Sequence, residues 1–322
     1  MKLNLRKTIL FLGLAFFVFF SSQSTAANYD VYVNSDNNTG IEDGTQAYPF
    51  NTIQEGIDVA ANNPKDQRNV FVNNGEYEES IVISSGVKLF GESQKRTIIR
   101  AIEKNWAVEM KKGSKIKKFR VYVKNKGIII SKEGDVDISK CTIKDADKIG
   151  IYIKKGSTKK SKEINIKNNK ISGGDGKGMY IKRSRVNIKD NEVYDLDEEG
   201  IDLRAGVKGK IKGNDIYNNG ETGLEFEIRK LDLKISKNKI KNNAASGVGA
   251  QFRKTNIYGD ILLKGNKIYK NANYGVKCAN TVGGHPNKNY FTKSLTLENN
   301  IFFKNSEGNG KGAFISRCGF SL

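Results

Sequence analysis

The sequence predicts an all-β solenoid, a coil of parallel strands in which one unit of about two dozen residues is stacked on itself. The first observation is a recurring phrase: an alternating apolar run, Asn-x-Ile or Asn-x-Val, a polar loop, then Gly and an apolar-polar-apolar triplet. The second is its spacing, because the central asparagines are 22, 23, 24, 28 and 34 residues apart: Asn169, Asn191, Asn214, Asn238, Asn266 and Asn300. An earlier copy has Cys141 in the place of asparagine.

The third observation is that each repeat contains two short alternating runs rich in β-branched residues and no long segment of period 3.6, which favours strands over helices. Leucine-rich repeats have a similar length, but leucine is too sparse here for their framework. Equivalent strands of successive coils should pair in parallel about 4.8 Å apart. We therefore expect the asparagines to form one column of hydrogen-bonded amides, each at a sharp left-handed bend between strands.

The N-terminus has the pattern of a secretory signal peptide over residues 1–27. Lys2, Arg6 and Lys7 precede an apolar run over residues 8–20, and small residues follow up to Ala27. No other segment is expected to span a membrane. We expect a secreted, periplasmic or cell-surface chain with one β-helix domain over 28–322, made of an N-terminal cap with the first coils (28–100) and repeat coils (101–322).

A short capping helix is predicted after Thr52, which has Glu55 three residues later in the arrangement of a capping box. Ile53, Ile57 and Ala60 fall on one face of that helix. We expect the helix to cover the open end of the first coil, because an uncovered parallel edge invites aggregation.

Net charge and cysteine content limit the classes of partner and cofactor. The formal net charge of +20 favours a polyanionic partner such as an acidic polysaccharide or a cell-envelope glycan, although lysines that simply solvate the surface explain it equally well. No basic and aromatic motif for nucleic acid is present, so nucleic acid is not expected as a partner. Cys141 and Cys278 are expected as buried thiols.

The opening of the mature chain resembles a known family. It contains Asp43-Gly44-Thr45, Pro49-Phe50-Asn51-Thr52-Ile53-Gln54, Val70-Phe71-Val72, Gly75-Glu76-Tyr77 and Val87-Lys88-Leu89-Phe90-Gly91. With the repeats, this is similar to the right-handed parallel β-helix proteins of the pectin-lyase-like superfamily. The resemblance implies a right-handed parallel β-helix, and the repeat period predicts roughly ten coils. Because the superfamily includes polysaccharide lyases, glycoside hydrolases, uronate epimerases, phage tailspikes and non-catalytic surface proteins, it leaves the function open.

Alternation predicts which side chains leave the solenoid. After each glycine the first and third residues should point inward and the second and fourth outward. The second positions form one outward column: Tyr152, Tyr180, Asp202, Glu225, Gly249 and Lys277. The fourth positions form another: Lys154, Lys182, Arg204, Glu227, Gln251 and Ala279. These two columns carry the candidate site.

Two stacked tyrosines beside acidic and basic residues are suited to an acidic sugar. Tyr152, Tyr180 and Lys154 are the candidate substrate-binding residues, since tyrosine rings can lie against sugar faces. Asp202, Glu225 and Glu227 are the candidate ligands of Ca²⁺, which would neutralise a uronate carboxylate during β-elimination. The candidate catalytic residues are Lys182 and Arg204, either of which could act as base if neighbouring cations lower its pKa, and Arg253.

Glu225-Phe226-Glu227 followed by Arg253 is similar to the calcium-dependent alginate and chondroitin lyases of the superfamily. The chain departs from that pattern at two positions. Asp232 stands where a lysine is expected, and Lys254 rather than histidine follows Arg253.

Other interpretations stay open. A glycoside hydrolase is ranked below a lyase: Asp202 and Glu225 should lie about one strand spacing apart, near the retaining separation, but the Asp-Asp pair of polygalacturonase-type members is absent. A non-catalytic surface scaffold or adhesin is the alternative, with the tyrosines and charge pairs only stabilising the strands. The acidic run 195–199 is expected to be solvated, and the single histidine, His285, falls in a long insertion.

Overall fold

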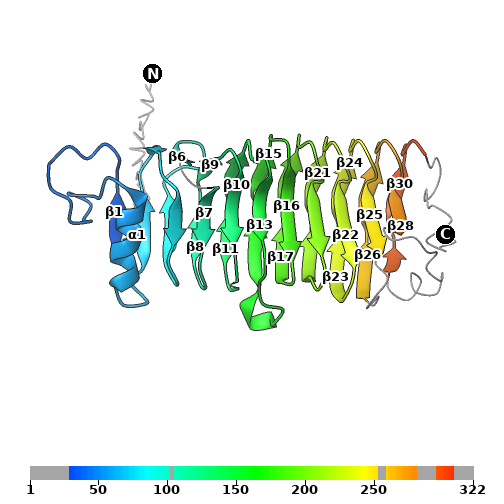
Figure 1. Ribbon diagram of the computed structural model, residues 1–322, viewed down its shortest axis with the longest axis horizontal. Coiled ribbons are helices and arrows are strands. Elements are labelled where there is room, and N and C mark those ends of the chain that lie inside the picture. The colour runs from blue at the N-terminus through cyan, green and yellow to red at the C-terminus, as the bar shows by residue number, and fades with distance from the viewer. Residues whose placement is uncertain (1–28, 102–104, 133, 253–258, 281–294, 308–322) are drawn as a thin grey trace, which may run out of the picture.

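The computed structural model describes residues 29–101, 105–132, 134–252, 259–280 and 295–307. The predicted signal peptide, Arg253, His285 and the C-terminal residues lie outside these ranges. In the described part the chain forms a right-handed solenoid of parallel strands with one α-helix and one short 3-10 helix, η1 (Lys160–Lys162). Figure 1 shows the coils following one another along the long axis.

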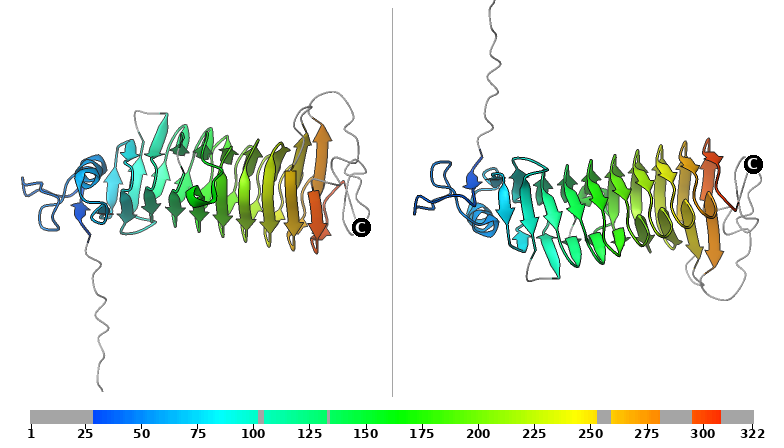
Figure 2. Two further views of the ribbon diagram at one scale, coloured as in Figure 1. Left: turned by 90° about the horizontal axis from the view of Figure 1, so that it is seen from below. Right: turned by 90° about the horizontal axis from the view of Figure 1, so that it is seen from above.

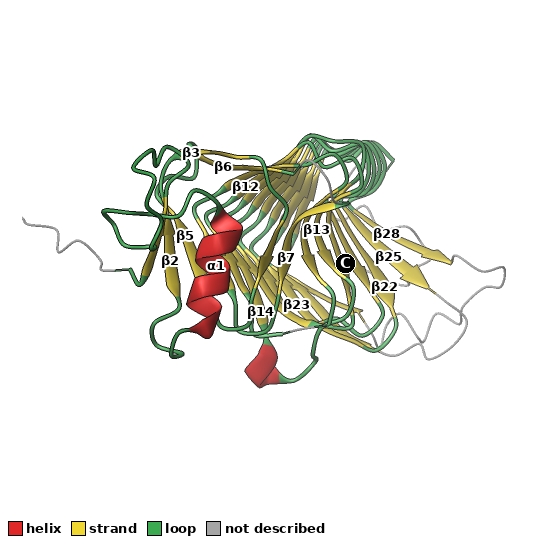
Figure 3. Cartoon of the chain, turned by 60° about the vertical axis from the view of Figure 1, so that its left-hand side comes forward, coloured by secondary structure: helices red, strands yellow, loops and turns green. Residues whose placement is uncertain are grey.

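Three parallel sheets form the faces of the solenoid, as the view along the coils shows (Figure 3). Sheet A has 11 strands in the order β1 (Val31–Val33), β2 (Asn69–Val72), β5 (Lys88–Gly91), β8 (Lys115–Lys117), β11 (Asp137–Ser139), β14 (Ile164–Lys167), β17 (Arg185–Lys189), β20 (Lys208–Lys212), β23 (Leu231–Ser236), β26 (Gly259–Lys264) and β29 (Leu295–Glu298).

From β2 onward, each described sheet A strand is followed by a strand of sheet B, which has 10 short strands whose rows run the length of the molecule in Figure 2. They are β3 (Gly75–Tyr77), β6 (Thr97–Arg100), β9 (Arg120–Tyr122), β12 (Thr142–Lys144), β15 (Lys170–Ser172), β18 (Glu192–Tyr194), β21 (Asp215–Tyr217), β24 (Lys239–Lys241), β27 (Lys267–Tyr269) and β30 (Ile301–Phe303). A coil therefore contains three strands, not the two runs read from the sequence, because the Asn-x-Ile segment is itself a strand.

Sheet C closes each coil and has nine strands. They are β4 (Ile81–Ile83), β7 (Trp106–Met110), β10 (Lys126–Ile130), β13 (Ile149–Ile153), β16 (Lys177–Lys182), β19 (Ile201–Arg204), β22 (Leu224–Ile228), β25 (Val248–Phe252) and β28 (Val276–Asn280). The glycine before each triplet is needed where coils approach closely: a Cβ on Gly200 would lie 2.7 Å from the Gly223 carbonyl oxygen.

The predicted asparagine column is confirmed at the corner between sheets A and B. Asn191 donates from its backbone nitrogen and from Nδ2 to Oδ1 of Asn214, both at 2.9 Å, and Nδ2 also donates to the Ile166 carbonyl at 2.9 Å. The same pattern repeats along the column, and the Cys141 nitrogen donates to Asn169 Oδ1 at 2.9 Å. Each amide thus satisfies buried backbone groups of the neighbouring coils, which fixes their register.

The left-handed bend lies one residue earlier than the sequence indicated. The residues before the column, not the column asparagines, have positive φ: Asn168 (56°), Asp190 (54°) and Lys237 (56°), with glycine at 213 and 265. The column asparagine is therefore selected for its side-chain hydrogen bonds, while the preceding position takes the backbone strain.

A second amide column, which the sequence analysis did not identify, lies at the corner between sheets B and C. It contains Asn219, Asn243, Asn271 and Asn305. Asn243 donates from Nδ2 to Asn271 Oδ1 at 2.9 Å, and its backbone nitrogen donates to the same oxygen at 3.1 Å. Both corners that flank the short sheet B strands are thus held by amides in this part of the chain.

The inward positions of the sheet C triplets are buried as predicted: Ile151, Ile153, Met179, Ile181, Ile201, Leu203, Leu224, Phe226, Val248, Ala250, Val276 and Cys278. Cys141 is a buried free thiol, as expected. Cys278 is buried but disulfide-bonded, so the expectation of a free thiol at that position was wrong.

The predicted cap is confirmed as α1 (Ile53–Asn62), which lies across the first coils against β1, β2 and β4 (Figures 1 and 3). Thr52 and Glu55 form the capping box, and Ile53, Ile57 and Ala60 are buried. The Glu79 carboxylate also accepts the first backbone N–H groups, from Ile53 at 2.7 Å and Gln54 at 3.0 Å. Among the described residues no helix has the length and apolar character needed to cross a membrane.

We expect Asn214→Ala to lower the free energy of unfolding by about 2–4 kcal/mol, because it leaves the Asn191 N–H and the Ile188 carbonyl buried without their amide partner. Asn187→Ala is the matched control, since that amide lies half-buried on the outer face of sheet A and, within the described ranges, its side chain bonds only Asn165. Urea unfolding measures both variants. Equal losses would contradict a special role for the column.

Candidate functional site

The outer face of sheet C carries the candidate site. The strand register confirms the first predicted column and pairs residues in parts of the second. Tyr152 pairs with Tyr180, Tyr180 with Asp202, Asp202 with Glu225, and Glu225 with Gly249. In the next column Lys182 pairs with Arg204, and Glu227 pairs with Gln251. Residues that are more than twenty positions apart in sequence therefore become neighbours across a strand spacing of about 4.8 Å.

The acidic side chains of this face point away from the core but are shielded from solvent. Asp202 is 0% exposed, Glu227 4% and Glu225 7%. Burial of several carboxylates is costly unless cations or protons compensate their charge. The arrangement around them is therefore the informative feature of the site.

Glu199 joins Asp202 and Glu225 in a group that we call the carboxylate cluster. One oxygen of each of these three buried residues lies within 4.8 Å of the others. Glu199 belongs to the acidic run that the sequence analysis expected to be solvated, and it is 4% exposed. The Gly178 nitrogen donates to the Glu199 carbonyl at 3.1 Å, which places Glu199 beside Lys177 in the column just before the glycines.

Two positively charged side chains, Arg204 and Lys177, contact the carboxylate cluster. Arg204 donates from Nη2 to Asp202 Oδ2 and to Glu225 Oε1, both at 2.8 Å, and from Nη1 to Gln251 Oε1 at 2.7 Å. Lys177 Nζ contacts the Glu199 carboxylate and lies 3.4 Å from Asp202 Oδ2. It also lies 3.0 Å from Glu198 Oε2, at the edge of the cluster.

The three carboxylates of the cluster share the two positive charges of Lys177 and Arg204, and the pKa values reflect this imbalance. Burial, followed by the nearby Glu199 charge, raises the pKa of Glu225 to about 7 despite Arg204. For Glu199, burial opposes ionisation but the hydrogen bond and charge of Lys177 outweigh it, so the pKa is lowered. Near neutral pH the Glu225 carboxylate is therefore protonated in part of the molecules. A further positive charge bound beside Glu225 would be favourable, because it would stabilise the ionised carboxylate.

The aromatic part of the face lies on the preceding coils. The Tyr152 and Tyr180 rings are stacked, with centroids 5.7 Å apart and planes 8° apart, and both are half-buried. Lys182 Nζ lies 4.5 Å from the centroid of the Tyr180 ring. Lys154 follows the end of β13 and is exposed. A flat aromatic surface edged by ammonium groups therefore adjoins the carboxylate cluster.

The structure does not bring all the predicted residues into one site. Glu227 is buried in the next column and lies outside the carboxylate cluster, whereas Glu199 lies within it. Arg253 lies outside the described residues. Burial favours the neutral form of Arg204, but Asp202 and Glu225 outweigh it and raise the pKa, which is the opposite of what a base requires. Glu199 could have been found from its position before Gly200, which corresponds to Lys177 before Gly178.

The donor set of the carboxylate cluster suits a hard cation such as Ca²⁺, which prefers carboxylate oxygens. The shortage of one positive charge, seen in the raised pKa of Glu225, points the same way. Lys177 and Arg204 already contact these carboxylates, so a bound cation would share oxygen atoms with them. Glu199, Asp202 and Glu225 are therefore the residues that would hold it.

The pH dependence of stability tests the environment of Glu225. Its pKa is raised from an ordinary value of 4.5 to about 7. The native state therefore holds more protons than the unfolded chain between these pH values, and stability from this group falls as pH rises through them. We expect wild type to lose about 1–3 kcal/mol relative to Glu225→Gln between pH 5 and pH 8. Urea unfolding in chelator measures this, with Glu192→Gln on sheet B as control. Parallel pH curves for wild type and Glu225→Gln would contradict it.

Comparisons with known proteins agree with this architecture. The family model described as "Right handed beta helix region" matches residues 126–289. Pectate lyase Pel9A is 14% identical with a TM-score of 0.60, covering 89% of this chain and 78% of its own. An alginate lyase from Paenibacillus sp. str. FPU-7 is 12% identical with a TM-score of 0.58, covering 81% of this chain and 96% of its own.

The mannuronan C-5 epimerase AlgE4 A-module of Azotobacter vinelandii is 17% identical with a TM-score of 0.54, covering 85% of this chain and 96% of its own. No curated protein matches the chain. These identities are low, so the solved structures establish the fold alone. Since the family model covers half of the sequence, the chain belongs to the right-handed β-helix family.

Proposed function

We propose that the protein binds an acidic polysaccharide along the outer face of sheet C and cleaves it by β-elimination. The observation that carries the proposal is the carboxylate cluster, three buried carboxylates with two cations, placed in register with the Tyr152–Tyr180 stack. The structural neighbours named above include two lyases and an epimerase of uronate polymers, which supports a glycan substrate by analogy of fold.

Substrate binding is assigned to the tyrosine stack and its edge. The rings of Tyr152 and Tyr180 present a half-buried flat surface on which sugar rings can lie, as aromatic residues commonly do with sugars. Lys154 and Lys182 edge this surface and supply positive charge for the carboxylates of the polymer. The polymer would run across the strands, along the column, toward the carboxylate cluster.

The chemistry requires removal of the proton next to the uronate carboxylate. A Ca²⁺ ion held by Glu199, Asp202 and Glu225 would supply the positive charge that neutralises this carboxylate. Lys182 is our proposed base, because Arg204 is held by Asp202, Glu225 and Gln251. The proton passes to Lys182 in its neutral amine form, the bond to the leaving oxygen breaks, and a carbon–carbon double bond forms. The Tyr180 hydroxyl, on the ring below Lys182, can return a proton to the leaving oxygen.

We further propose that the protein acts outside the cytoplasm, in the periplasm or at the cell surface. The N-terminal sequence has the features of a signal peptide. The disulfide at Cys278 supports this location, since disulfides persist mainly in oxidising compartments.

A non-catalytic glycan-binding scaffold is the second candidate. One observation favours it: Lys177 and Arg204 already pair with all three members of the carboxylate cluster. A scaffold would bind the polymer on the same face and release no unsaturated product. The two candidates are therefore separated by the product and not by binding.

Incubation with alginate, pectate or chondroitin should produce ultraviolet absorbance from the new double bond, and chelation of Ca²⁺ should abolish it. We expect Glu225→Gln to retain about 1% or less of the rate, since a lost metal ligand removes several kcal/mol of stabilisation. Glu227→Gln tests the residue that lies outside the cluster, and Glu192→Gln is the surface control. Full activity of Glu225→Gln would exclude the proposed site. Glycan binding without absorbance on any polymer would favour the scaffold.

The tyrosine stack is tested by comparison with a similar stack on another face. We expect Tyr180→Ala to weaken binding of the cleaved polymer about tenfold, because it removes one of two aromatic surfaces. The Tyr194 and Tyr217 rings on sheet B stack at 4.9 Å and 4°, so Tyr194→Ala removes an equivalent contact away from the site. Equal effects of both variants on the dissociation constant would show that the stack acts only on stability.

A further inference from the structure

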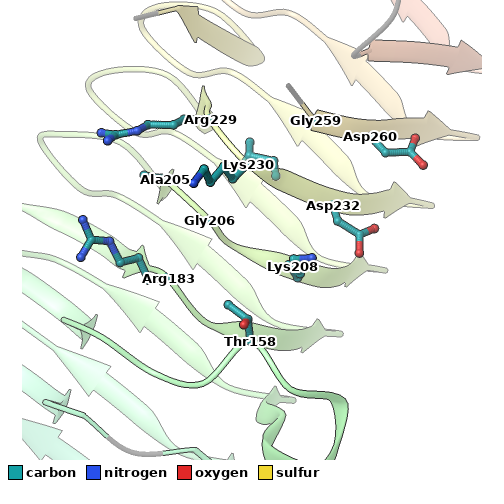
Figure 4. Close-up of a pocket in the computed structure, with 11 residues that line it drawn as sticks. Thr158, Arg183, Ala205, Gly206, Lys208, Arg229, Lys230, Asp232, Gly259 and Asp260 are labelled. Carbon is teal, nitrogen blue, oxygen red and sulfur yellow. The ribbon is translucent and has the colours of Figure 1, made fainter. Parts of the chain in front are cut away.

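Three hollows on the outer face of sheet A join into one surface. The first, the edge groove, has a volume of about 780 Å³ and lies where sheet C turns into sheet A (Figure 4). The second, of about 260 Å³, shares Asp232 and Asp260 with it. The third, of about 400 Å³, shares Lys210 and Lys234 with the second. We call this continuous surface the basic band.

The edge groove is lined by two arginines, Arg183 and Arg229. Figure 4 shows Arg183 and Arg229 projecting toward the same side, with Asp232 and Asp260 at the other end. The Arg183 nitrogen donates to the Ala205 carbonyl and the Gly206 nitrogen to the Arg229 carbonyl, so the arginines flank a floor of small residues. In the described part of the chain no ion pair involves Arg183 or Arg229. Two guanidinium groups about two strand spacings apart therefore face an open groove.

Lysines continue the band across sheet A. Lys210 pairs in register with Lys234, so two like charges lie on adjacent strands. Lys212 pairs in register with Lys189, whose Nζ lies 3.1 Å from Asp190 Oδ2. Lys210, Lys212 and Lys234 are exposed, and none has an ion pair with another described residue. At the far end, by contrast, Lys264 Nζ is 2.6 Å from Glu298 Oε2. Unpaired like charges on neighbouring strands are unfavourable, and a bound anion would relieve the repulsion.

We propose that the basic band is a second binding site for the carboxylate or sulfate groups of an acidic glycan. It lies on a different sheet from the carboxylate cluster and is independent of the chemistry proposed there. Guanidinium groups at the edge suit two-point contact with such oxyanions, and the lysines add positive charge along the strand direction. None of the described residues that line the three hollows is aromatic, so they offer no stacking surface of the kind that single-stranded nucleic acid requires.

The test compares a band variant with a control of equal charge. The band variant is Lys210→Gln/Lys212→Gln/Lys234→Gln, and the control is Lys65→Gln/Lys95→Gln/Lys112→Gln, whose lysines are also exposed but lie on the first coils. Binding of heparin, polygalacturonate and a thymidine oligonucleotide is measured by calorimetry over a range of salt concentrations. We expect the band variant to lose about tenfold in affinity for at least one glycan, with a smaller salt dependence. The control should change little.

A further variant tests the arginines of the edge groove. Arg183→Gln/Arg229→Gln should weaken binding of the same glycan, whereas the sheet B variant Glu192→Gln should leave it unchanged. If the band variant loses affinity only for heparin, the site binds sulfate groups. If it loses affinity only for polygalacturonate, the site binds carboxylate groups. Equal losses for the band variant and the control would overturn the proposal, as would tighter binding of the oligonucleotide than of either glycan. If the protein shows lyase activity but the band variant binds glycan as wild type does, the proposed function stands and only the basic band is refuted as a site.

Discussion

The amide column at the corner of sheets A and B is the interaction on which the rest of the structure depends. Each column asparagine accepts from the coil before it and donates to the coil after it, and it also satisfies a buried carbonyl. This reciprocal bonding works only when the coils are in one vertical register. That register then places Tyr180, Asp202 and Glu225 on adjacent strands. The site is therefore a consequence of packing at a corner that contains none of its residues.

Strand alternation and repeat spacing were enough to predict the column and the inward triplets, and the capping box at Thr52 with one apolar helical face predicted the capping helix. The second amide column was missed because its asparagines sit in turns that follow strands of only three residues, as at Asp215–Tyr217 before Asn219. The sequence likewise placed the left-handed bend on the column asparagine, although the residue before it takes that conformation. The repeated sequence pattern identifies which residue types recur. It does not show which of two adjacent residues adopts the strained left-handed backbone conformation.

Within the candidate site, the sequence predicted that the acidic side chains point outward but not that they are buried. Asp202 and Glu225 point outward, as alternation requires, yet Lys177, Glu199 and Arg204 gather around them. The acidic run 195–199 resembled a solvated loop because charge density alone gives no sign of enclosure. Glu199 differs from its neighbours only in lying next to Gly200, where the coils approach closely. Such three-dimensional shielding depends on side chains from several coils, which a linear pattern does not reveal.

The two charged faces of the molecule have opposite character. The carboxylate cluster on sheet C has more negative than positive charges, and the basic band on sheet A has more positive than negative charges. Calcium titration by calorimetry at pH 6 and pH 8 tests the first of these most directly. The central claim predicts binding of one ion that is tighter at pH 8, releases protons near pH 7 as Glu225 ionises, and is lost in Glu225→Gln. Absence of binding, or equal binding by Glu225→Gln, would contradict it.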